Sequence, residues 1–156
     1  MIDYRVVPER FNMSSVLLDR HIAEGRGSRT AILTPDATLT YQGLFELTNR
    51  VGNALKALGV EPEQRVAILL PDGPAFVAAF LGAMKIGAVS IPLNTFAGPD
   101  DFEYFLNDSR AKALVVGASF YGKIEPIRSR CPSLKHVIVE GAEAPGCLAF
   151  DALIGG

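Results

Sequence analysis

The chain has 156 residues, with 15 Lys+Arg against 17 Asp+Glu, and its formal net charge is −2. This balance excludes the strongly basic surface by which many proteins bind nucleic acid. An apolar fraction of 49% with only 21% charged residues excludes an intrinsically disordered chain and predicts one packed domain of ordinary size. No apolar run approaches the roughly 18 residues of a membrane-spanning helix.

The cysteines and the N-terminus indicate the compartment. Cys131 and Cys147 are too few for a disulfide framework and lack the spacing of a metal-binding pair, which favours a reducing environment. Residues 1–5 lack the basic-then-apolar order of a signal peptide, so we expect a cytoplasmic protein. The mean hydropathy of +0.24 is high for a free-standing soluble domain. Either the core is unusually full, or one face is covered by something else.

The first third of the chain predicts three elements. Apolar spacing predicts a short helix over 13–22, turn residues predict a hairpin over 31–40, and a second apolar stripe predicts a helix over 41–58. Residues that commonly cap helices or form turns occur at each boundary. These residues are Asn12 and Ser14 for the first helix, Pro35 and Asp36 for the hairpin, and Thr40 and Gly59 for the second helix.

Beyond residue 60, apolar stretches of strand length alternate with helical patterns. The predicted strands are 66–70, 88–91, 113–116 and 136–139, and the intervening helices begin at Pro74, after Gly98, and at Ser119 as N-cap. Such alternation is typical of right-handed crossovers in a mostly parallel sheet. The predicted fold class is therefore α/β: a mostly parallel, helix-covered sheet of βα units with a small N-terminal hairpin.

The same pattern predicts the domain organisation. Residues 1–139 are expected to form this α/β subdomain. Residues 140–156 are rich in Gly and Ala and are expected to be a connector, in which the apolar residues 148–150 form one more short element.

The glycine patterns give little support to a nucleotide site within the chain. Gly25-Arg26-Gly27 opens like a dinucleotide-binding motif, but it precedes a strand and Thr30 replaces the final glycine. Residues 70–73 follow a strand and open a helix, which is the correct place for an anion. Pro71 and Pro74, however, remove backbone donors, which favours a simple turn.

Other chemistry-bearing residues also favour structural roles. His21 and His136 have no ligand-spaced partners, and Cys131 before Pro132 is best interpreted as a small apolar residue. Asp100 and Asp101 at a helix start favour capping over acid–base chemistry, and Lys85 is expected to be solvated. The residues alone therefore assign no catalytic group and no metal ligand.

Three ordered segments resemble the core motifs of acyl-adenylate-forming enzymes. The segments are LTYQGL at 39–44, RVAILLPDGP at 65–74 and MKIGAVSIPLN at 84–94. Within that superfamily, which includes acid–CoA ligases, LPDG at 70–73, NT at 94–95 and DDFEY at 100–104 look most like the benzoate–CoA ligase group.

The resemblance implies an enzyme that uses ATP and magnesium to form an acyl-adenylate, from which the thiol of CoA displaces AMP. It also implies that this chain is an N-terminal fragment that ends before the phosphate-gripping loop and the catalytic lysine. The fragment itself is then expected to be inactive and to bind no cofactor. In such enzymes the loop after the second core motif lies near the CoA path. Here that loop is Asn94, Thr95 and Phe96, and the loop could instead simply support the subdomain interface.

The resemblance also implies a partner. The missing cover of the subdomain would be the remainder of the ligase chain, or a second copy bound through an exposed apolar face. An alternative is a free-standing α/β binding or assembly module that has the ligase-like fold without catalysis. A dinucleotide-binding domain is a third interpretation, which the missing glycine motif disfavours.

Overall fold

The structure is a computed structural model that describes residues 8–9, 11–35 and 37–155. Residues 1–5 and Asp36, which entered the signal-peptide and hairpin-turn predictions, lie outside the described residues. Within the described ranges, no helix combines the length and the apolar character needed to cross a membrane.

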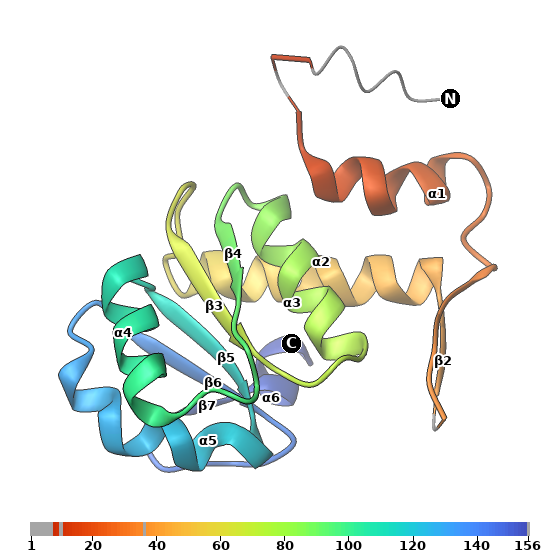
Figure 1. Cartoon of the computed structure of the whole chain (residues 1–156). Coiled ribbons are helices and arrows are strands. Elements are labelled where there is room, and N and C mark those ends of the chain that lie inside the picture. Colours follow the sequence, from red (N-terminus) through yellow and green to blue (C-terminus); the bar gives the residue numbers. More distant parts are fainter. Residues whose placement is uncertain (1–7, 10, 36, 156) are drawn as a thin grey trace.

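A five-stranded sheet in the order β4-β3-β5-β6-β7 forms the centre of the molecule, and each neighbouring pair is parallel (Figure 1). An antiparallel hairpin of β1 and β2 precedes it in the chain. The strands are β1 (Thr30–Leu33), β2 (Thr38–Thr40), β3 (Arg65–Leu69), β4 (Val89–Pro92), β5 (Ala113–Gly117), β6 (His136–Glu140) and β7 (Leu148–Ala149). The helices are η1 (Ser15–Asp19), α1 (Arg20–Ala23), α2 (Tyr41–Ala57), α3 (Pro74–Lys85), α4 (Pro99–Ser109), α5 (Ala118–Ile124), η2 (Glu125–Arg130) and α6 (Phe150–Ile154). The predicted α/β class, with its parallel sheet and N-terminal hairpin, is confirmed.

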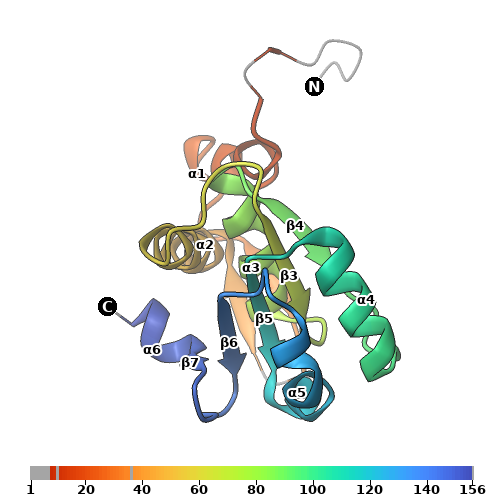
Figure 2. The same ribbon diagram turned by 90° about the vertical axis from the view of Figure 1, so that its left-hand side faces the viewer.

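The central strands are covered on both faces. Along β3, Val66 and Ile68 pack on the face of α2 and α3, whereas Ala67 and Leu69 pack on the face of α4 and α5. Figure 2 shows α2 and α6 on one side of the sheet and α4 and α5 on the other. Because side chains alternate along a strand, burial on both faces requires a continuous apolar run, which is what the sequence has at 66–70.

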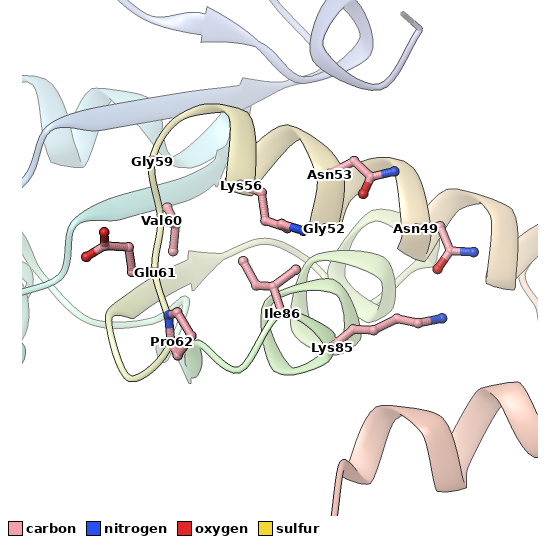
Figure 3. A pocket seen from close by; sticks show the side chains of 10 residues that line it. All are labelled: Asn49, Gly52, Asn53, Lys56, Gly59, Val60, Glu61, Pro62, Lys85 and Ile86. Atoms are coloured by element: carbon pink, nitrogen blue, oxygen red, sulfur yellow. The ribbon is translucent and has the colours of Figure 1, made fainter.

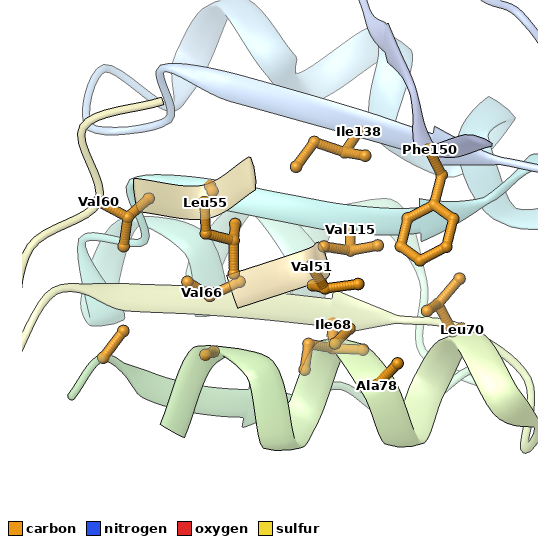
Figure 4. Packing of buried hydrophobic residues seen from close by; sticks show 14 residues of the cluster. Val51, Leu55, Val60, Val66, Ile68, Leu70, Ala78, Val115, Ile138 and Phe150 are labelled. Atoms are coloured by element: carbon orange, nitrogen blue, oxygen red, sulfur yellow. The ribbon is translucent and has the colours of Figure 1, made fainter. Parts of the chain in front are cut away.

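The C-terminal segment completes one face of the sheet. The strand β7 pairs with β6, and Phe150, which follows it, is 5% exposed in the cluster that also contains Val51, Val115 and Ile138 (Figure 4). The short element expected at 148–150 is therefore confirmed. Residues 140–156, expected to be a connector, contribute this strand and α6 to the fold.

The helix boundaries follow capping chemistry at most positions. The Oγ1 of Thr40 accepts a hydrogen bond from the Gly43 N–H at 3.1 Å, and Gly59 has a φ of +77°, so both predicted boundaries of α2 are confirmed. The Asn12 side chain accepts a bond from the Ser15 N–H at 3.4 Å. The predicted cap at Ser14 is wrong, because within the described residues its buried Oγ has no hydrogen-bond partner.

The predicted cap at Ser119 is also wrong. The helix α5 begins at Ala118 with Gly117 in the capping position, so Ser119 already lies inside the first turn. The reason is that β5 continues to Gly117, which pairs with Glu140 of β6, and the helix follows it directly.

The helices α2 and α3 contact each other through glycines. A Cβ on Gly82 of α3 would lie 3.0 Å from the carbonyl oxygen of Thr48 and 3.2 Å from the Gly52 nitrogen, both in the α2 backbone. A larger residue at position 82 would therefore require the two helix backbones to move apart by a few tenths of an ångström.

The two outer strands of the sheet are short. At one edge β4 has four residues and ends in Pro92, and at the other edge β7 has two residues. Proline has no backbone N–H, so an edge or terminal position is where a parallel sheet tolerates it.

Candidate functional site

The carboxyl ends of the parallel strands lie along one edge of the sheet, which we call the carboxyl edge (residues 70–75, 93–98, 117–118 and 140–141). The neighbouring strands β3 and β5 send their connections in opposite directions, through α3 to β4 and through α5 to β6. In open α/β sheets, ligands bind outside the carboxyl ends of strands at such a reversal. The carboxyl edge is therefore the candidate functional site.

A hollow of about 320 Å³ opens at this edge, lined by residues 70–75, by Glu140 at the end of β6 and by the turn of the hairpin. Two of its lining residues, Asp72 and Glu140, carry carboxylates, and Pro71 and Pro74 bring no backbone donors. A phosphate is held by N–H donors and positive charge. The geometry therefore agrees with the prediction that residues 70–73 form a strand-to-helix turn.

The loop that follows β4 carries the predicted residues Asn94, Thr95 and Phe96. The Oδ1 of Asn94 accepts a hydrogen bond from the Phe96 N–H at 3.0 Å, and its backbone oxygen accepts one from the Ala97 N–H at 3.1 Å. The Phe96 side chain is 94% exposed. Asn94 therefore stabilises the turn through both its side-chain oxygen and its backbone oxygen, and its role is to shape the loop. Phe96 is the side chain that the loop presents to solvent.

A lysine from a distant part of the chain also holds this loop. The Nζ of Lys123, in α5, donates to the carbonyl oxygens of Thr95 and Ala97, both at 3.0 Å. Sequence analysis missed this residue, since no local pattern links positions 28 residues apart. Its placement depends on the fold, which brings α5 beside the loop at the carboxyl edge.

The neighbouring acidic pair is structural, as the sequence predicted. The Oδ2 of Asp101 accepts a hydrogen bond from the Gly98 N–H at 3.0 Å, which caps the first turn of α4. Asp100 lies in the same turn, where the helix dipole favours a negative charge.

A second hollow, of about 710 Å³, lies between α2 and the end of α3, beside the segment that leads into β3 (Figure 3). The prediction that Lys85 in its lining is simply solvated is wrong. The Nζ of Lys85 lies 2.7 Å from Oδ1 of Asp19 and 4.3 Å from the centre of the Phe45 ring. Since this hollow is at the amino end of the strands and the charge of Lys85 is paired, the carboxyl edge stays the candidate site. The hollow is lined by Asn49, Gly52, Asn53, Lys56, Gly59, Val60, Glu61, Pro62, Lys85 and Ile86.

The titratable candidates have structural surroundings. Burial raises the pKa of the Cys131 thiol, so this side chain stays neutral and packs as a small apolar group, as predicted. The His21 ring stacks on Tyr41 with centroids 4.0 Å apart, and the Nε of Arg26 donates to its Nδ1 at 3.0 Å. Burial and the Arg26 charge lower the pKa of His21, which favours the neutral ring that accepts this bond. Among the residues that the structure describes, no three His, Cys, Asp or Glu gather into a metal site.

Comparison with known proteins identifies the family. A family model described as AMP-binding enzyme matches residues 19–152. The chain belongs to the AMP-binding enzyme family. The match covers the five strands of the parallel sheet and the helices α2 to α5, so it does not depend on one motif.

Two kinds of relative support the assignment to this family. The chain is 37% identical over 144 residues to the benzoate–CoA ligase of Thauera aromatica, which covers 92% of this chain and 27% of that protein. Among solved structures, it matches the anthranilate CoA ligase AuaEII in complex with anthranoyl-AMP, with a TM-score of 0.91, 37% identity, and coverage of 96% of this chain and 29% of that one. A benzoate CoA ligase from Burkholderia xenovorans LB400 matches with a TM-score of 0.83, 30% identity, and coverage of 94% and 29%.

These matches confirm the resemblance to the benzoate–CoA ligase group and place the fold among adenylate-forming ligases. The chain of this AMP-binding family member spans under a third of the length of the relatives it matches. The shared region is their N-terminal portion.

Proposed function

We propose that this chain is the N-terminal portion of an ATP-dependent carboxylic acid–CoA ligase that activates an aromatic acid such as benzoate. The observation that carries the proposal is the match to aryl-acid ligases over more than nine-tenths of the chain in both sequence and structure. In the proposed reaction, the acid carboxylate attacks the α-phosphorus of ATP to give acyl-AMP and pyrophosphate. The CoA thiol then displaces AMP to give the thioester. Activation is needed because a carboxylate is a poor electrophile until one oxygen becomes part of a good leaving group.

We propose a division of labour along the protein. Residues 1–139 form most of the α/β subdomain, and residues 140–156, which add β7 and α6 to it, lead toward the portion that binds ATP and magnesium and performs catalysis. We assign no catalytic residue and no metal ligand to this chain, and we expect it to have no activity and no cofactor of its own. In the same proposal the protein is cytoplasmic.

We propose that the carboxyl edge contributes to the binding of CoA through Asn94, Thr95 and Phe96. The exposed ring of Phe96 fits a planar adenine or the apolar stem of pantetheine. The charge of Lys123 is directed at the carbonyls of Thr95 and Ala97, so the loop offers stacking and shape but no cation for a phosphate.

The isolated chain is expected to catalyse no ATP–pyrophosphate exchange with benzoate or any other acid. Such transfers depend on positioned groups that stabilise phosphoryl charge, and this sequence contains no glycine-rich phosphate-binding motif that ends in Lys followed by Ser or Thr. The measurement is radiolabelled pyrophosphate exchange, with a complete benzoate–CoA ligase as the positive control. Exchange above a buffer blank, with protein free of host ligases, would contradict the proposal.

A protein that joins this chain to its catalytic portion is expected to prefer benzoate or a close small aromatic acid. We expect a kcat/KM for benzoate at least about tenfold above that for a long-chain fatty acid, because pockets discriminate by size and fit. A panel of benzoate, 4-hydroxybenzoate, hexanoate and palmitate measures this ratio. A higher kcat/KM for palmitate would overturn the choice of aromatic acids.

The isolated chain is also expected to bind a hydrophobic dye and to self-associate at micromolar concentration. Phe11, Met13 and Leu17 are 46%, 48% and 50% exposed at the N-terminal helix, and apolar area left in water is unfavourable by about 25 cal/mol per Å². Light scattering and dye titration test this, comparing Met13→Glu/Leu17→Glu with Leu33→Glu as a control at an exposed hairpin position. A monomeric, dye-negative chain would argue against the need for a covering partner.

The gene sequence that follows position 156 distinguishes this proposal from the alternative of a free-standing module without catalysis. A Ser/Thr/Gly-rich loop that ends in Lys, encoded within a few tens of residues after position 156, supports the ligase. An open reading frame that stops without such a loop supports the module.

A further inference from the structure

The loop over residues 93–97 presents an apolar ring to solvent on an ordered backbone. Phe96 is 94% exposed, the largest exposure among the exposed apolar side chains of the described residues. Fixing a loop backbone costs conformational entropy, and this loop gains no burial of Phe96 in return. Hydrogen bonds therefore provide the order, and those from Asn94 are neutral and exposed.

The strongest of these bonds come from Lys123. Its ammonium donates to the carbonyl oxygen of Thr95, in the peptide that precedes Phe96, and to that of Ala97, in the peptide that follows Ala97. The Nζ lies 5.9 Å from the ring centres of both Phe102 and Phe120, and the contacts to the loop are partly buried. Bonds from a charged donor are roughly twice as strong as neutral ones, and the aromatic faces favour a cation in this place.

We infer that Lys123 is a positioning residue that fixes the direction of Phe96 for contact with CoA. The inference rests on the proposed function for the role of Phe96, and on the two carbonyl bonds for the role of Lys123. By holding one carbonyl before Phe96 and one after it, this side chain restrains the backbone rotations that would turn the ring away. Pre-organisation of this kind improves binding because less freedom is lost when the ligand arrives.

The first experiment measures the order of the loop without any ligand. In Lys123→Met, the Ala97 amide is expected to exchange with solvent about tenfold faster, because the opening of the loop no longer breaks charged hydrogen bonds. Lys123→Arg keeps the positive charge and has enough N–H donors for both carbonyls, so slow exchange is expected to be restored. Lys123→Gln has one neutral amide group, and its exchange rate is expected to lie between those of Lys123→Met and Lys123→Arg.

Lys112→Met is the matched control, since the Nζ of Lys112 donates to the carbonyl of Gly59 in a different loop. It should leave exchange at Ala97 unchanged. Exchange at Ala97 that stays within about twofold of wild type in both Lys123→Met and Lys123→Gln would overturn the inference. If Lys123→Met melts too early to measure, the comparison of Lys123→Gln with Lys123→Arg decides the question.

The second experiment separates this inference from the proposed function. The chain contains no tryptophan, so Phe96→Trp gives a single fluorescent reporter in the loop. With Lys123 present we expect high anisotropy. Because the chain supplies only part of the proposed CoA site, we expect a change in emission only at high CoA concentration. With Lys123→Met in the same background we expect lower anisotropy and a weaker response to CoA. High anisotropy that depends on Lys123, without any response to CoA, would refute the proposed CoA contact and leave the positioning role intact. Anisotropy that does not depend on Lys123 would refute the positioning role.

Discussion

The substitution Gly82→Ala is expected to lower the free energy of unfolding by about 1–2 kcal/mol, because overpacking of the contact between α2 and α3 outweighs the gain in helix propensity from alanine. The new methyl group would lie 3.0 Å from the Thr48 carbonyl oxygen and 3.2 Å from both the Gly52 nitrogen and the Val51 Cβ. Two of these three neighbours are backbone atoms of a 17-residue helix, which cannot give way as the end of a flexible side chain can. Urea denaturation followed by circular dichroism measures the effect.

The matched control is Gly122→Ala in α5. No atom lies within 4 Å of a Cβ added to Gly122, and alanine favours a helix over glycine by up to about 1 kcal/mol. This substitution is therefore expected to leave stability unchanged or to raise it slightly. Equal effects of the two substitutions would mean that α2 and α3 do not meet as closely as the structure shows.

The substitution Phe150→Ala is expected to lower the free energy of unfolding by about 3–4 kcal/mol. The Phe150 ring is 5% exposed and fills the cluster between α2 and the sheet, where Val51 and Ile138 also lie (Figure 4). Its removal would leave a cavity lined by side chains from α2, β5 and β6. Thermal and urea melts measure the loss.

A control at an exposed position and the size of the Phe150→Ala effect together decide whether the segment after β6 belongs to the core. Leu33→Ala, at a side chain that is 76% exposed, is expected to change stability by less than about 0.5 kcal/mol. A small effect of Phe150→Ala would show that the segment after β6 is only a connector. A large effect would show that it belongs to the core.

The sheet was predictable because its causes are local. A run of apolar residues such as 66–70 predicts a strand covered on both faces, and Thr40 and Gly59 predict helix boundaries through bonds and backbone angles within a few residues. The cap at Ser119 was predicted wrongly because its cause is not local. The pairing of Gly117 with Glu140, on a strand distant in sequence, extends β5 up to the first residue of α5.

The candidate site was less predictable for the same reason. The position of Asn94, Thr95 and Phe96 came from a family resemblance, whereas their geometry depends on Lys123 in α5, the third element after the loop. The pairing of Lys85 with Asp19 joins residues 66 positions apart. No spacing rule connects such positions, since only the folded chain brings them together.

The short outer strands limit how copies of this chain can meet. A long, flat edge strand offers a row of free backbone groups on which another chain can add a strand, and this is a common route to aggregation. Here one edge ends in Pro92, which has no N–H to donate, and the other edge is the two-residue β7. Strand addition is thus poorly supported at either side, so association should proceed through side chains on the helices. Amide I infrared spectra of the associated form should then show the strand content of the monomer, without the growth of intermolecular sheet.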